Sequence, residues 1–226
     1  MQPNVRQKII TFFAQYSLKF YDKDEIMIYG DEDPTGIFYI VSGQVRQYDI
    51  SPSGEEMVLN VFQQPSIFPL SWAINQTPNK YFYSTYTDSA IRTAPADETL
   101  RFILNNPDVA YDLMKEIVAG IEVLQKRTSL LMGGCSQSRV MFELLINCKR
   151  FGIRQSDGSC LLNIHEGELA HRAGLTRETV SRELVKLERQ HILDVKHSNM
   201  VIQDAGQLEY QLANTGLGIS ATDLPK

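Results

Sequence analysis

The sequence has 226 residues, of which 43% are hydrophobic and 22% charged, the composition of an ordinary globular protein with room for two modest domains. Its formal net charge at pH 7 is −5, so charge alone does not indicate a nucleic-acid-binding protein, and any attraction for phosphate must come from where the basic residues lie. There is neither a charged leader followed by an apolar segment nor a run of about 18 apolar residues. No secretion signal or membrane span is therefore predicted, and we expect a cytoplasmic protein.

The cysteines and histidines do not have the spacing of a metal site. Cys135, Cys148 and Cys160 are separated by 13 and 12 positions, and no C-x-x-C occurs, so we interpret them as buried or idle thiols. His165 and His171 are six positions apart, whereas the zinc-protease motif needs a separation of four to place both on one helix face. No catalytic triad or paired-acid spacing is present either, so we predict neither a metal site nor an enzyme.

The first half of the chain reads as a short helix followed by β-strands. Apolar residues recur at helical spacing between Pro3 and Tyr16. From Leu18 to about Pro95, short β-rich runs alternate with turn clusters. The predicted strands are Glu25–Tyr29, Ile37–Val41, Gln44–Ile50, Glu56–Phe62, Tyr81–Thr87 and Ser89–Thr93. Many short strands at near-regular spacing predict an antiparallel β-roll or jelly roll.

A long helix is predicted to begin at Pro107. Its apolar residues form a seam that no later strand can cover, so we expect it to pair with the same helix of a second copy of the chain. The alternative is a helix that lies on the β-roll alone. The predicted seam residues are Leu113, Ile117, Leu124 and Leu131. Gly133 and Gly134 then end or loosen the helix, because glycine has the most backbone freedom to lose.

The last third of the chain reads as a winged helix-turn-helix. Ser138 is predicted to cap a helix that ends near Phe151, and a strand follows from Cys160 to Ile164. A short amphipathic pattern from His165 to Gly174 and a longer one from Thr176 to Leu193 then form a helix-turn-helix. Two short strand patterns around Ser198-Asn199 predict a hairpin, the wing, and a further short helix is expected from Ala205.

The start of the longer helix carries side chains suited to reading bases. Glu178 and Arg182 are four residues apart and therefore project from one side of the helix, next to Arg177. An arginine donates two hydrogen bonds to guanine, and a carboxylate accepts one from cytosine. The alternative is a solvated helix face with an ordinary Glu178–Arg182 pair. The predicted phosphate contacts, each of which could instead be a cap or a surface residue, are His165, Thr176, Thr179 and Lys196.

Two segments resemble a known family. The segment GLTRETVSRELVKLE (Gly174 to Glu188) resembles the recognition helix of the Crp/Fnr transcription regulators, in particular the catabolite-activator type with its Arg-Glu-Thr-Val-x-Arg motif. The run GIFYIVSGQVRQY (Gly36 to Tyr48) resembles the central strands of the cyclic-nucleotide-binding β-roll. The resemblance implies an α+β fold with a β-roll sensor domain (1–106), a dimerisation helix with its hinge (107–135), a winged helix-turn-helix (136–204) and a tail (205–226).

The resemblance also implies a function. We expect a homodimer that binds double-stranded DNA at an inverted TGTGA-like repeat and works with RNA polymerase. Arg177 and Arg182 would contact guanines, and Glu178 would contact the cytosine opposite. Gly133 and Gly134 would form the hinge through which an effector moves the reading heads, the helix-turn-helix domains of the two copies. The alternative is a ligand-binding module that acts through protein partners.

The effector is not predicted, and it is open whether one exists. The family's cyclic-nucleotide binders use a Gly-Glu-Leu turn and a later arginine, but here Pro69 stands in place of the glycine and residues 66–84 contain no arginine, which argues against cyclic AMP. This stretch is somewhat more similar to the family's cyanobacterial nitrogen regulators, which sense 2-oxoglutarate, although their ligand-binding arginine corresponds to Gly120. The cysteine positions do not fit the family's iron–sulfur members. The candidate pocket residues, which could equally be core, are Phe68, Leu70, Trp72, Lys80, Tyr81 and Leu124.

Overall fold

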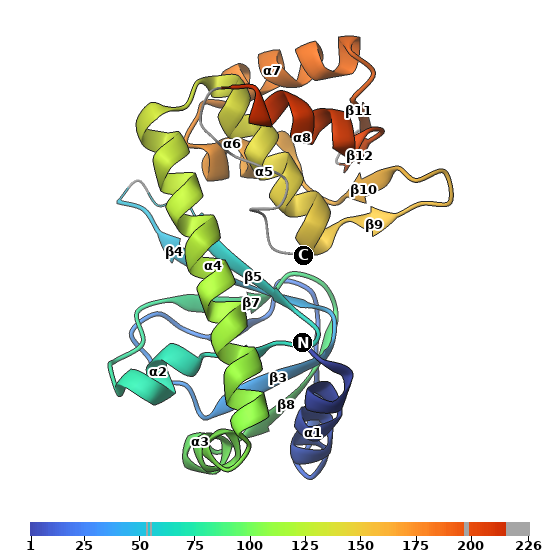
Figure 1. The fold of residues 1–226 in the computed structure, drawn as a ribbon. Helices are drawn as coiled ribbons and strands as arrows, with labels where there is room; N and C mark the ends of the chain where they lie inside the picture. Colours follow the sequence, from blue (N-terminus) through green and yellow to red (C-terminus); the bar gives the residue numbers. More distant parts are fainter. Residues whose placement is uncertain (53, 55, 197–198, 216–226) are drawn as a thin grey trace. The chain divides into compact units, whose positions relative to one another are not determined.

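The computed structural model describes residues 1–52, 54, 56–196 and 199–215, and Figure 1 traces their helices and strands. The chain divides into two compact units, Met1–Glu116 and Ile117–Lys226. The boundary lies within the long helix α4 (Pro107–Gly133), so this helix contributes to both units.

The first unit is an antiparallel β-roll, which confirms the fold predicted from its short strands and turns. Its strands are β1 (Leu18–Tyr21), β2 (Ile26–Ile28), β3 (Ile37–Ser42), β4 (Gln44–Ile50), β5 (Glu56–Gln63), β6 (Ile67–Phe68), β7 (Phe82–Thr85) and β8 (Ser89–Ala94). They form two four-stranded sheets with the orders β1-β8-β3-β6 and β2-β7-β4-β5. Gly43 turns the chain from β3 into β4 with φ +89°, and a Cβ there would meet Ser89 Oγ at 2.2 Å, so this turn requires glycine.

Aromatic rings fill the space between the two sheets. Phe68 stacks on Phe38, Phe62 and Tyr83 with ring centroids 5.0–5.5 Å apart and interplanar angles of 15–19°. Strands β3 and β6 of one sheet and β5 and β7 of the other carry these rings, which therefore meet in the middle of the β-roll. Offset stacking of this kind adds to the stabilisation that burial of the rings already provides.

Three helices accompany the strands of the first unit. They are α1 (Pro3–Ala14), α2 (Leu70–Asn75) and α3 (Ala96–Leu104). Helix α1 was predicted and buries Val5, Ile9 and Phe13 against the first turns of α4. Helices α2 and α3 and the short strands β1 and β6 were not predicted, because each is shorter than the window over which an apolar period can be recognised.

Helix α4 leaves a line of apolar side chains exposed along most of its length. Ile117 and Leu124 are about half exposed and Leu131 is 41% exposed. Leu113 differs, because it is 7% exposed and packs in the core of the first unit with Val109. Further exposed apolar residues on the same helix are Tyr111, Met114, Val118, Ile121 and Met132.

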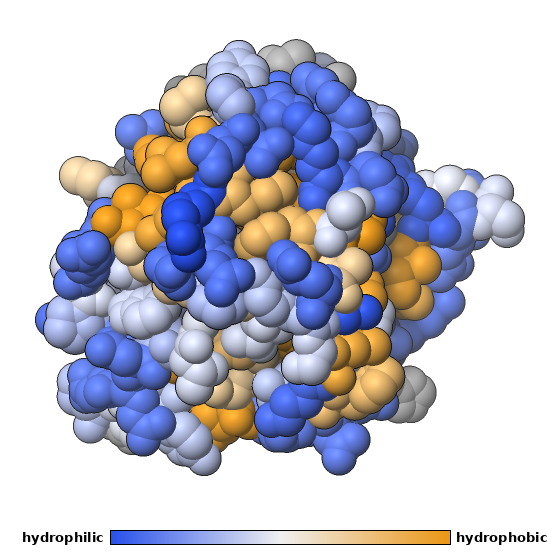
Figure 2. All heavy atoms as spheres, turned by 90° about the horizontal axis from the view of Figure 1, so that it is seen from below, coloured by the Kyte–Doolittle hydropathy of each residue, from blue (hydrophilic) through white to orange (hydrophobic). Residues whose placement is uncertain are grey.

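Apolar residues also reach the surface elsewhere. On the face drawn in Figure 2, hydrophobic residues lie interspersed with hydrophilic ones. Phe20 and Leu104 are examples of single exposed side chains in the first unit. Singly exposed apolar residues are normal, whereas the repeated ones on α4 form a continuous line and need an explanation.

In the second unit, the described residues form four further helices and one sheet. The helices are α5 (Ser136–Phe151), α6 (Glu166–Ala173), α7 (Arg177–Arg189) and α8 (Ala205–Ala213), and the strands are β9 (Ile153–Arg154), β10 (Cys160–Leu162), β11 (Leu193–Lys196) and β12 (Asn199–Ile202). The sheet order is β11-β12-β10-β9, and a core formed by all four helices lies against it. Ser198-Asn199 was predicted as the turn of the wing, but Asn199 is the first residue of β12. Residues 197–198 of the predicted wing and 216–226 of the predicted tail lie outside the described residues.

The start of α5 differs from the prediction. The helix begins at Ser136 with Cys135 as its N-cap residue, whereas Ser138 was predicted to cap it. The Ser138 hydroxyl is buried inside the first turn, where it donates to the Cys135 carbonyl at 2.8 Å. A serine often caps a helix, but its hydroxyl can also bond to a carbonyl within the first turn, and sequence does not separate the two cases.

Candidate nucleic-acid interface

Helices α6 and α7 and the turn between them form the predicted helix-turn-helix. The Nδ1 atom of His165 accepts the Glu168 N–H at 3.2 Å and caps α6, while the Thr176 hydroxyl accepts the Thr179 N–H at 3.3 Å and caps α7. In the turn Gly174 has φ +61°, and a Cβ there would meet Leu131 Cδ2 at 2.9 Å. The turn therefore needs glycine both for its left-handed backbone and for the close approach of Leu131.

Helix α7 buries one face and exposes the other. Arg177, Glu178 and Arg182, the predicted base-reading residues, lie outside the buried set of this helix. The buried face consists of Val180, Leu184 and Leu187, which are at most 1% exposed, together with Glu183, which is 5% exposed. The core thus fixes the rotation of the helix, and this rotation places the two arginines and the glutamate together on the outer side.

Each of the two outer arginines has one acceptor close by. The Nε of Arg177 lies 3.6 Å from Oε2 of Glu166, the first residue of α6. The Nη2 of Arg182 donates to the Thr179 hydroxyl at 3.2 Å. Both acceptors lie outside the predicted reading set, and no feature of the sequence indicated the Glu166 contact.

Glu178 is held in its ionised form. Hydrogen bonds from its own backbone N–H and from the Thr176 hydroxyl keep the pKa of its carboxyl below the usual range, and the charges of Arg177 and Arg182 act in the same direction. At neutral pH the side chain therefore carries only acceptors, as contact with the amino group of cytosine requires.

The four predicted phosphate-contact residues lie in two places. His165 and Thr176 are the N-cap residues of α6 and α7, and the Thr179 hydroxyl lies 3.1 Å from that of Thr176. Because Nδ1 of His165 accepts a backbone hydrogen bond, a neutral ring carries its proton on Nε2, which can donate to a phosphate oxygen. Lys196 is exposed at the end of β11 in the wing.

Gly133 and Gly134, the predicted hinge, have different surroundings. Gly133 is the last residue of α4, and a Cβ there would meet nothing within 4 Å. At Gly134 a Cβ would lie 2.7 Å from the Leu130 carbonyl oxygen. Arg139 of α5 is bonded to the end of α4. Its guanidinium donates to the carbonyls of Leu130 and Gly134 at 3.1 Å and of Leu131 at 2.8 Å. The Leu130 carbonyl also accepts from the Gly134 N–H, whereas the Leu131 and Gly134 carbonyls lie past the last turn of α4, where intrahelical donors run out.

The junction between α4 and α5 is also bonded to helix α7. The Ser136 hydroxyl, at the first residue of α5, donates to Oε1 of Glu183 at 2.8 Å. Glu183 lies on the inner side of α7, is 5% exposed, and also accepts from Lys186 at 2.9 Å. The segment that follows the glycines and the helix that carries the reading residues are thus joined by a direct hydrogen bond.

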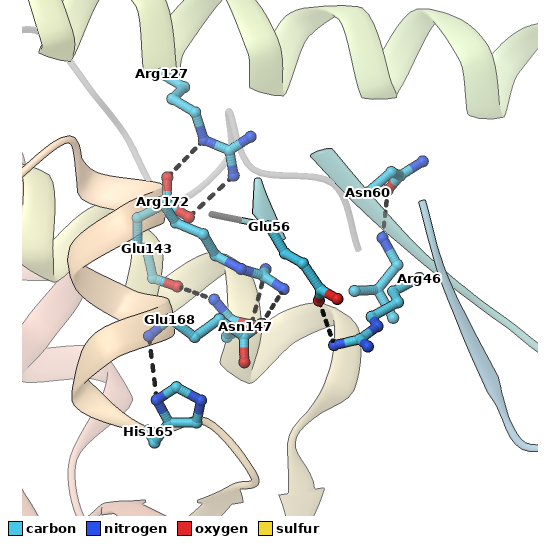
Figure 3. Close-up of polar contacts among 10 residues, drawn as sticks. Arg46, Glu56, Asn60, Arg127, Glu143, Asn147, His165, Glu168 and Arg172 are labelled. Atoms are coloured by element: carbon cyan, nitrogen blue, oxygen red, sulfur yellow. Dashed lines mark hydrogen bonds and ion pairs between the residues drawn. The ribbon is translucent and has the colours of Figure 1, made fainter. Parts of the chain in front are cut away.

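A polar network connects α4, α5 and α6 (Figure 3). Arg127 of α4 forms two parallel bonds to the buried carboxylate of Glu143 of α5, at 2.6 and 2.9 Å. One turn further along α5, the Asn147 side-chain amide donates to the Glu143 carbonyl and accepts from Arg172 of α6. Arg172 also pairs with Glu168 at 2.6 Å, and among the described residues its Nε is buried without a partner. Side-chain bonds therefore run from the long helix to the helix-turn-helix.

The chain is similar to known proteins over most of its length. Residues 18–106 match the cyclic nucleotide-binding domain and residues 138–210 match the Crp-like helix-turn-helix domain. The "Global nitrogen regulator" of Synechocystis sp. is 21% identical over 84% of this chain and 86% of that protein. The "CRP-like cAMP-activated global transcriptional regulator" of Mycobacterium tuberculosis is 22% identical over 76% and 77%. The solved structure of a CRP/FNR-family transcriptional regulator from Thermus thermophilus has the same fold, with a TM-score of 0.69 and 19% identity over 88% of this chain and 98% of that one.

The decisive observation is that both domain matches occur on one chain, in this order, and together cover most of it. The chain belongs to the Crp/Fnr family. It is a DNA-binding transcription regulator, and the prediction that it is not an enzyme agrees with the nature of this family.

The β-roll of this Crp/Fnr regulator does not fit a cyclic nucleotide, although its fold is that of the cyclic nucleotide-binding domain. The ring stack around Phe68 occupies the middle of the roll. Pro69 precedes α2 and offers no N–H to a phosphate. Arg46 is already engaged by Asp24, Glu56 and Ser84 (Figure 3 shows the Glu56 pair). We therefore assign no cyclic nucleotide to this domain.

The predicted effector-pocket residues have diverse environments. Phe68 is 1% exposed in the ring stack, and Leu70 and Trp72 are packed against the core formed by α1 and α4. The indole N–H of Trp72 donates to Asp33 at 3.1 Å. Three of the predicted residues are exposed, namely Lys80, Tyr81 and Leu124. Their joint role in an effector pocket stays a prediction.

Two further findings, on metal ligands and on membrane spans, refer to the described residues. Within them no three His, Cys, Asp or Glu side chains are grouped as metal ligands would be. Cys148 and Cys160 are buried, and burial together with the neighbouring Cys160 raises the pKa of the Cys148 thiol to about 12, which makes it a poor nucleophile. No helix within the described ranges combines the length and the apolar character needed to cross a bilayer.

Proposed function

We propose that this regulator is a homodimer that reads an inverted repeat of TGTGA-like half-sites. The observation that carries the proposal is the position of Arg177, Glu178 and Arg182 together on the outer side of α7, a capped helix whose other face is core. A helix of this kind enters the major groove with its N-terminal residues against the base edges. Each arginine would donate to a guanine and Glu178 would accept from a cytosine.

Four residues would contact the DNA backbone. His165, Thr176, Thr179 and Lys196 carry N–H or O–H donors at the ends of the two helices and in the wing. Phosphate contacts of this kind fix the register of the protein on the duplex without reading its sequence. Because the net charge of the chain is −5, we expect binding to depend on these few local contacts and to weaken as salt is added.

Helix α4 would provide the dimer contact. Its exposed apolar line has no cover within the described part of the chain, and pairing with the same line of a second copy would bury it. Two copies related by a two-fold axis would place their α7 helices about 34 Å apart, one turn of the duplex, which corresponds to an inverted repeat.

The remaining expectations follow from the role in transcription. RNA polymerase would be the protein partner at the promoter, and the cytoplasm the compartment in which both act. The Gly133–Gly134 junction would transmit the state of the sensor domain to the reading heads. The effector is unidentified, and constitutive activity is the alternative to control by an effector.

The proposal is tested by selecting duplexes from a random pool with the wild-type protein and with Arg177→Ala and Arg182→Ala. We expect the wild type to enrich an inverted repeat. Each variant should lose about 1–3 kcal/mol of discrimination per half-site at one base pair, because one pair of hydrogen bonds to a guanine is removed. Enrichment of no motif by the wild type would instead favour a ligand-binding module that acts through protein partners.

A further inference from the structure

Two residues outside the reading set contact its arginines. Glu166 lies 3.6 Å from Nε of Arg177, and the Thr179 hydroxyl accepts from Arg182 at 3.2 Å. A long side chain on a protein surface normally samples several rotamers, and ordering it on binding costs free energy. A contact that already favours one rotamer in the free protein reduces that cost.

The backbone fixes the position of Glu166 relative to Arg177. Glu166 is the first residue of α6 and Arg177 the first residue of α7, and each directly follows a residue that caps its helix. Gly174 sets the angle of the turn between the two helices, and both helices are anchored in the same core. The carboxylate and the guanidinium therefore face each other across a rigid turn, and only their own side chains remain to be ordered.

The contact with Glu166 involves Nε of Arg177 and not its terminal amino groups. Glu166 approaches the Nε edge of the guanidinium. Among the described residues, the terminal amino groups of Arg177 have no hydrogen-bond partner. A guanidinium that is held at Nε and open at its two terminal nitrogens can present them as a fork, which matches the O6 and N7 atoms of guanine.

The Thr179 hydroxyl links Arg182 to the cap of α7. It lies 3.1 Å from the Thr176 hydroxyl, so one of the two hydroxyls donates to the other. The Thr179 oxygen also accepts from Nη2 of Arg182 at 3.2 Å. A reading residue is therefore bonded, through Thr179, to the N-cap residue of its own helix.

We propose that Glu166 and Thr179 are positioning residues that hold Arg177 and Arg182 in the rotamers that read bases. The inference rests on the proposed function, in which these two arginines contact guanines. It adds the support of Arg182 to the backbone contact proposed for Thr179. Glu166 is an acid close to the DNA, so its removal should lower sequence discrimination without lowering the overall attraction for DNA.

The test for Glu166 compares Glu166→Gln with Glu209→Gln. Glu209 is a matched control, because its side chain has the same 24% exposure and is also ion-paired, but it lies on α8. Dissociation constants are measured at one salt concentration for the selected operator and for operators with each base pair replaced in turn. We expect Glu166→Gln to reduce discrimination about threefold at the base pair that Arg177→Ala relaxes, as loss of an exposed ion pair allows. Glu209→Gln should leave it unchanged.

The test for Thr179 compares Thr179→Val, which keeps the shape and loses the hydroxyl, with Thr179→Ser, which keeps the hydroxyl. Valine should reduce discrimination at the Arg182 base pair by a similar factor of about three, and serine should restore it. All variants should keep the thermal midpoint of the wild type within a few degrees, because both contacts lie at the surface.

Combination with the arginine variants separates positioning from a general effect. In the Arg177→Ala background, Glu166→Gln should not change discrimination further, because its partner is gone. Unchanged discrimination in Glu166→Gln, or an equal loss at every base pair, would overturn the inference while leaving the proposed function intact. If Arg177→Ala itself relaxed no base pair, both the inference and the assignment of Arg177 to a guanine would be overturned.

Discussion

Glu183 is a charged residue on the inner side of α7, and hydrogen bonds from Ser136 and Lys186 compensate its burial. Burial by itself raises the pKa of its carboxyl, but these bonds and the charges of Lys186 and Arg182 outweigh it and hold the pKa below the ordinary 4.5. A carboxyl with a lower pKa in the folded than in the unfolded chain contributes stability above pH 4.5, and this contribution is lost as the pH falls through the folded-state pKa.

The variant Glu183→Gln removes this titration. We expect it to be about 1–2 kcal/mol less stable than the wild type at pH 7, because a charged acceptor is replaced by a neutral one. Its free energy of unfolding should also fall less steeply as the pH is lowered below 4.5. Urea unfolding at a series of pH values measures both effects, with Glu209→Gln as the control. Equal slopes below pH 4.5 for wild type and variant would contradict the role of Glu183.

Lys196 offers a different kind of test, because a phosphate contact carries no sequence information. Lys196→Ala should weaken binding to the operator and to unrelated duplexes by the same factor. It should also reduce the slope of log affinity against log salt by about 1 per half-site. Titrations at four or five salt concentrations provide the slope. A change in base preference with an unchanged slope would mean that Lys196 reads a base instead.

At the scale of elements, the pair between Arg127 and Glu143 joins α4 to α5. The Glu143 side chain is 1% exposed, so loss of its partner would leave a buried charge uncompensated. We expect Arg127→Ala to lower the free energy of unfolding by about 3 kcal/mol. Arg101→Ala removes an equally short but exposed pair with Asp97 and should cost less than about 0.5 kcal/mol. Urea unfolding curves distinguish these outcomes, and similar losses in both variants would show that burial does not determine the effect.

The two glycines between α4 and α5 should respond differently to alanine. Gly133 is helical with open space around its Cα, so Gly133→Ala should stabilise α4 by about 0.5–1 kcal/mol. At Gly134 a Cβ would meet Leu130 at 2.7 Å, so Gly134→Ala disfavours the broken junction. If extension of the long helix favours DNA binding, Gly134→Ala should raise operator affinity without effector more than Gly133→Ala does. Operator titrations of both single variants and the double variant decide this, and equal affinity in all of them would remove the hinge assignment.

For the whole molecule, the order of domains could be predicted because each has a strong local signal. Alternating short strands indicated the β-roll, the long apolar period indicated α4, and Gly174 and Thr176 marked the turn within the helix-turn-helix. The three reading residues of α7 could be placed on the outer side because they are close in sequence and the apolar positions of the same helix define the buried side.

What could not be predicted depends on contacts between distant residues. Glu143 and Asn147 lie four residues apart on the buried side of α5, which indicates a polar contact but does not identify Arg127 or Arg172 as the partners. The Glu166 contact with Arg177 follows only from the angle between α6 and α7. Phe68 was expected either in a pocket or in the core, and the three rings that stack on it come from separate strands, which sequence alone does not bring together.

The proposed dimerisation of two copies of the chain can be tested on the exposed apolar line of α4. Ile121 lies in the middle of the exposed apolar line and is 48% exposed. In a paired helix Ile121→Glu would bring a charge and its copy into an apolar contact, where charges are strongly disfavoured. We expect this variant to sediment as a monomer and to lose about tenfold or more in affinity for the full inverted repeat, because the second reading head no longer benefits from a high local concentration.

The control is Lys115→Glu, on another side of the same helix. It changes the charge by two units where Ile121→Glu changes it by one, so a general electrostatic effect on DNA binding would be larger in the control. Affinity for a single half-site should be similar in both variants and in the wild type, since helix α7 is far along the chain from either substitution. A dimeric Ile121→Glu protein, or equal loss of operator affinity in both variants, would mean that the copies associate through another surface.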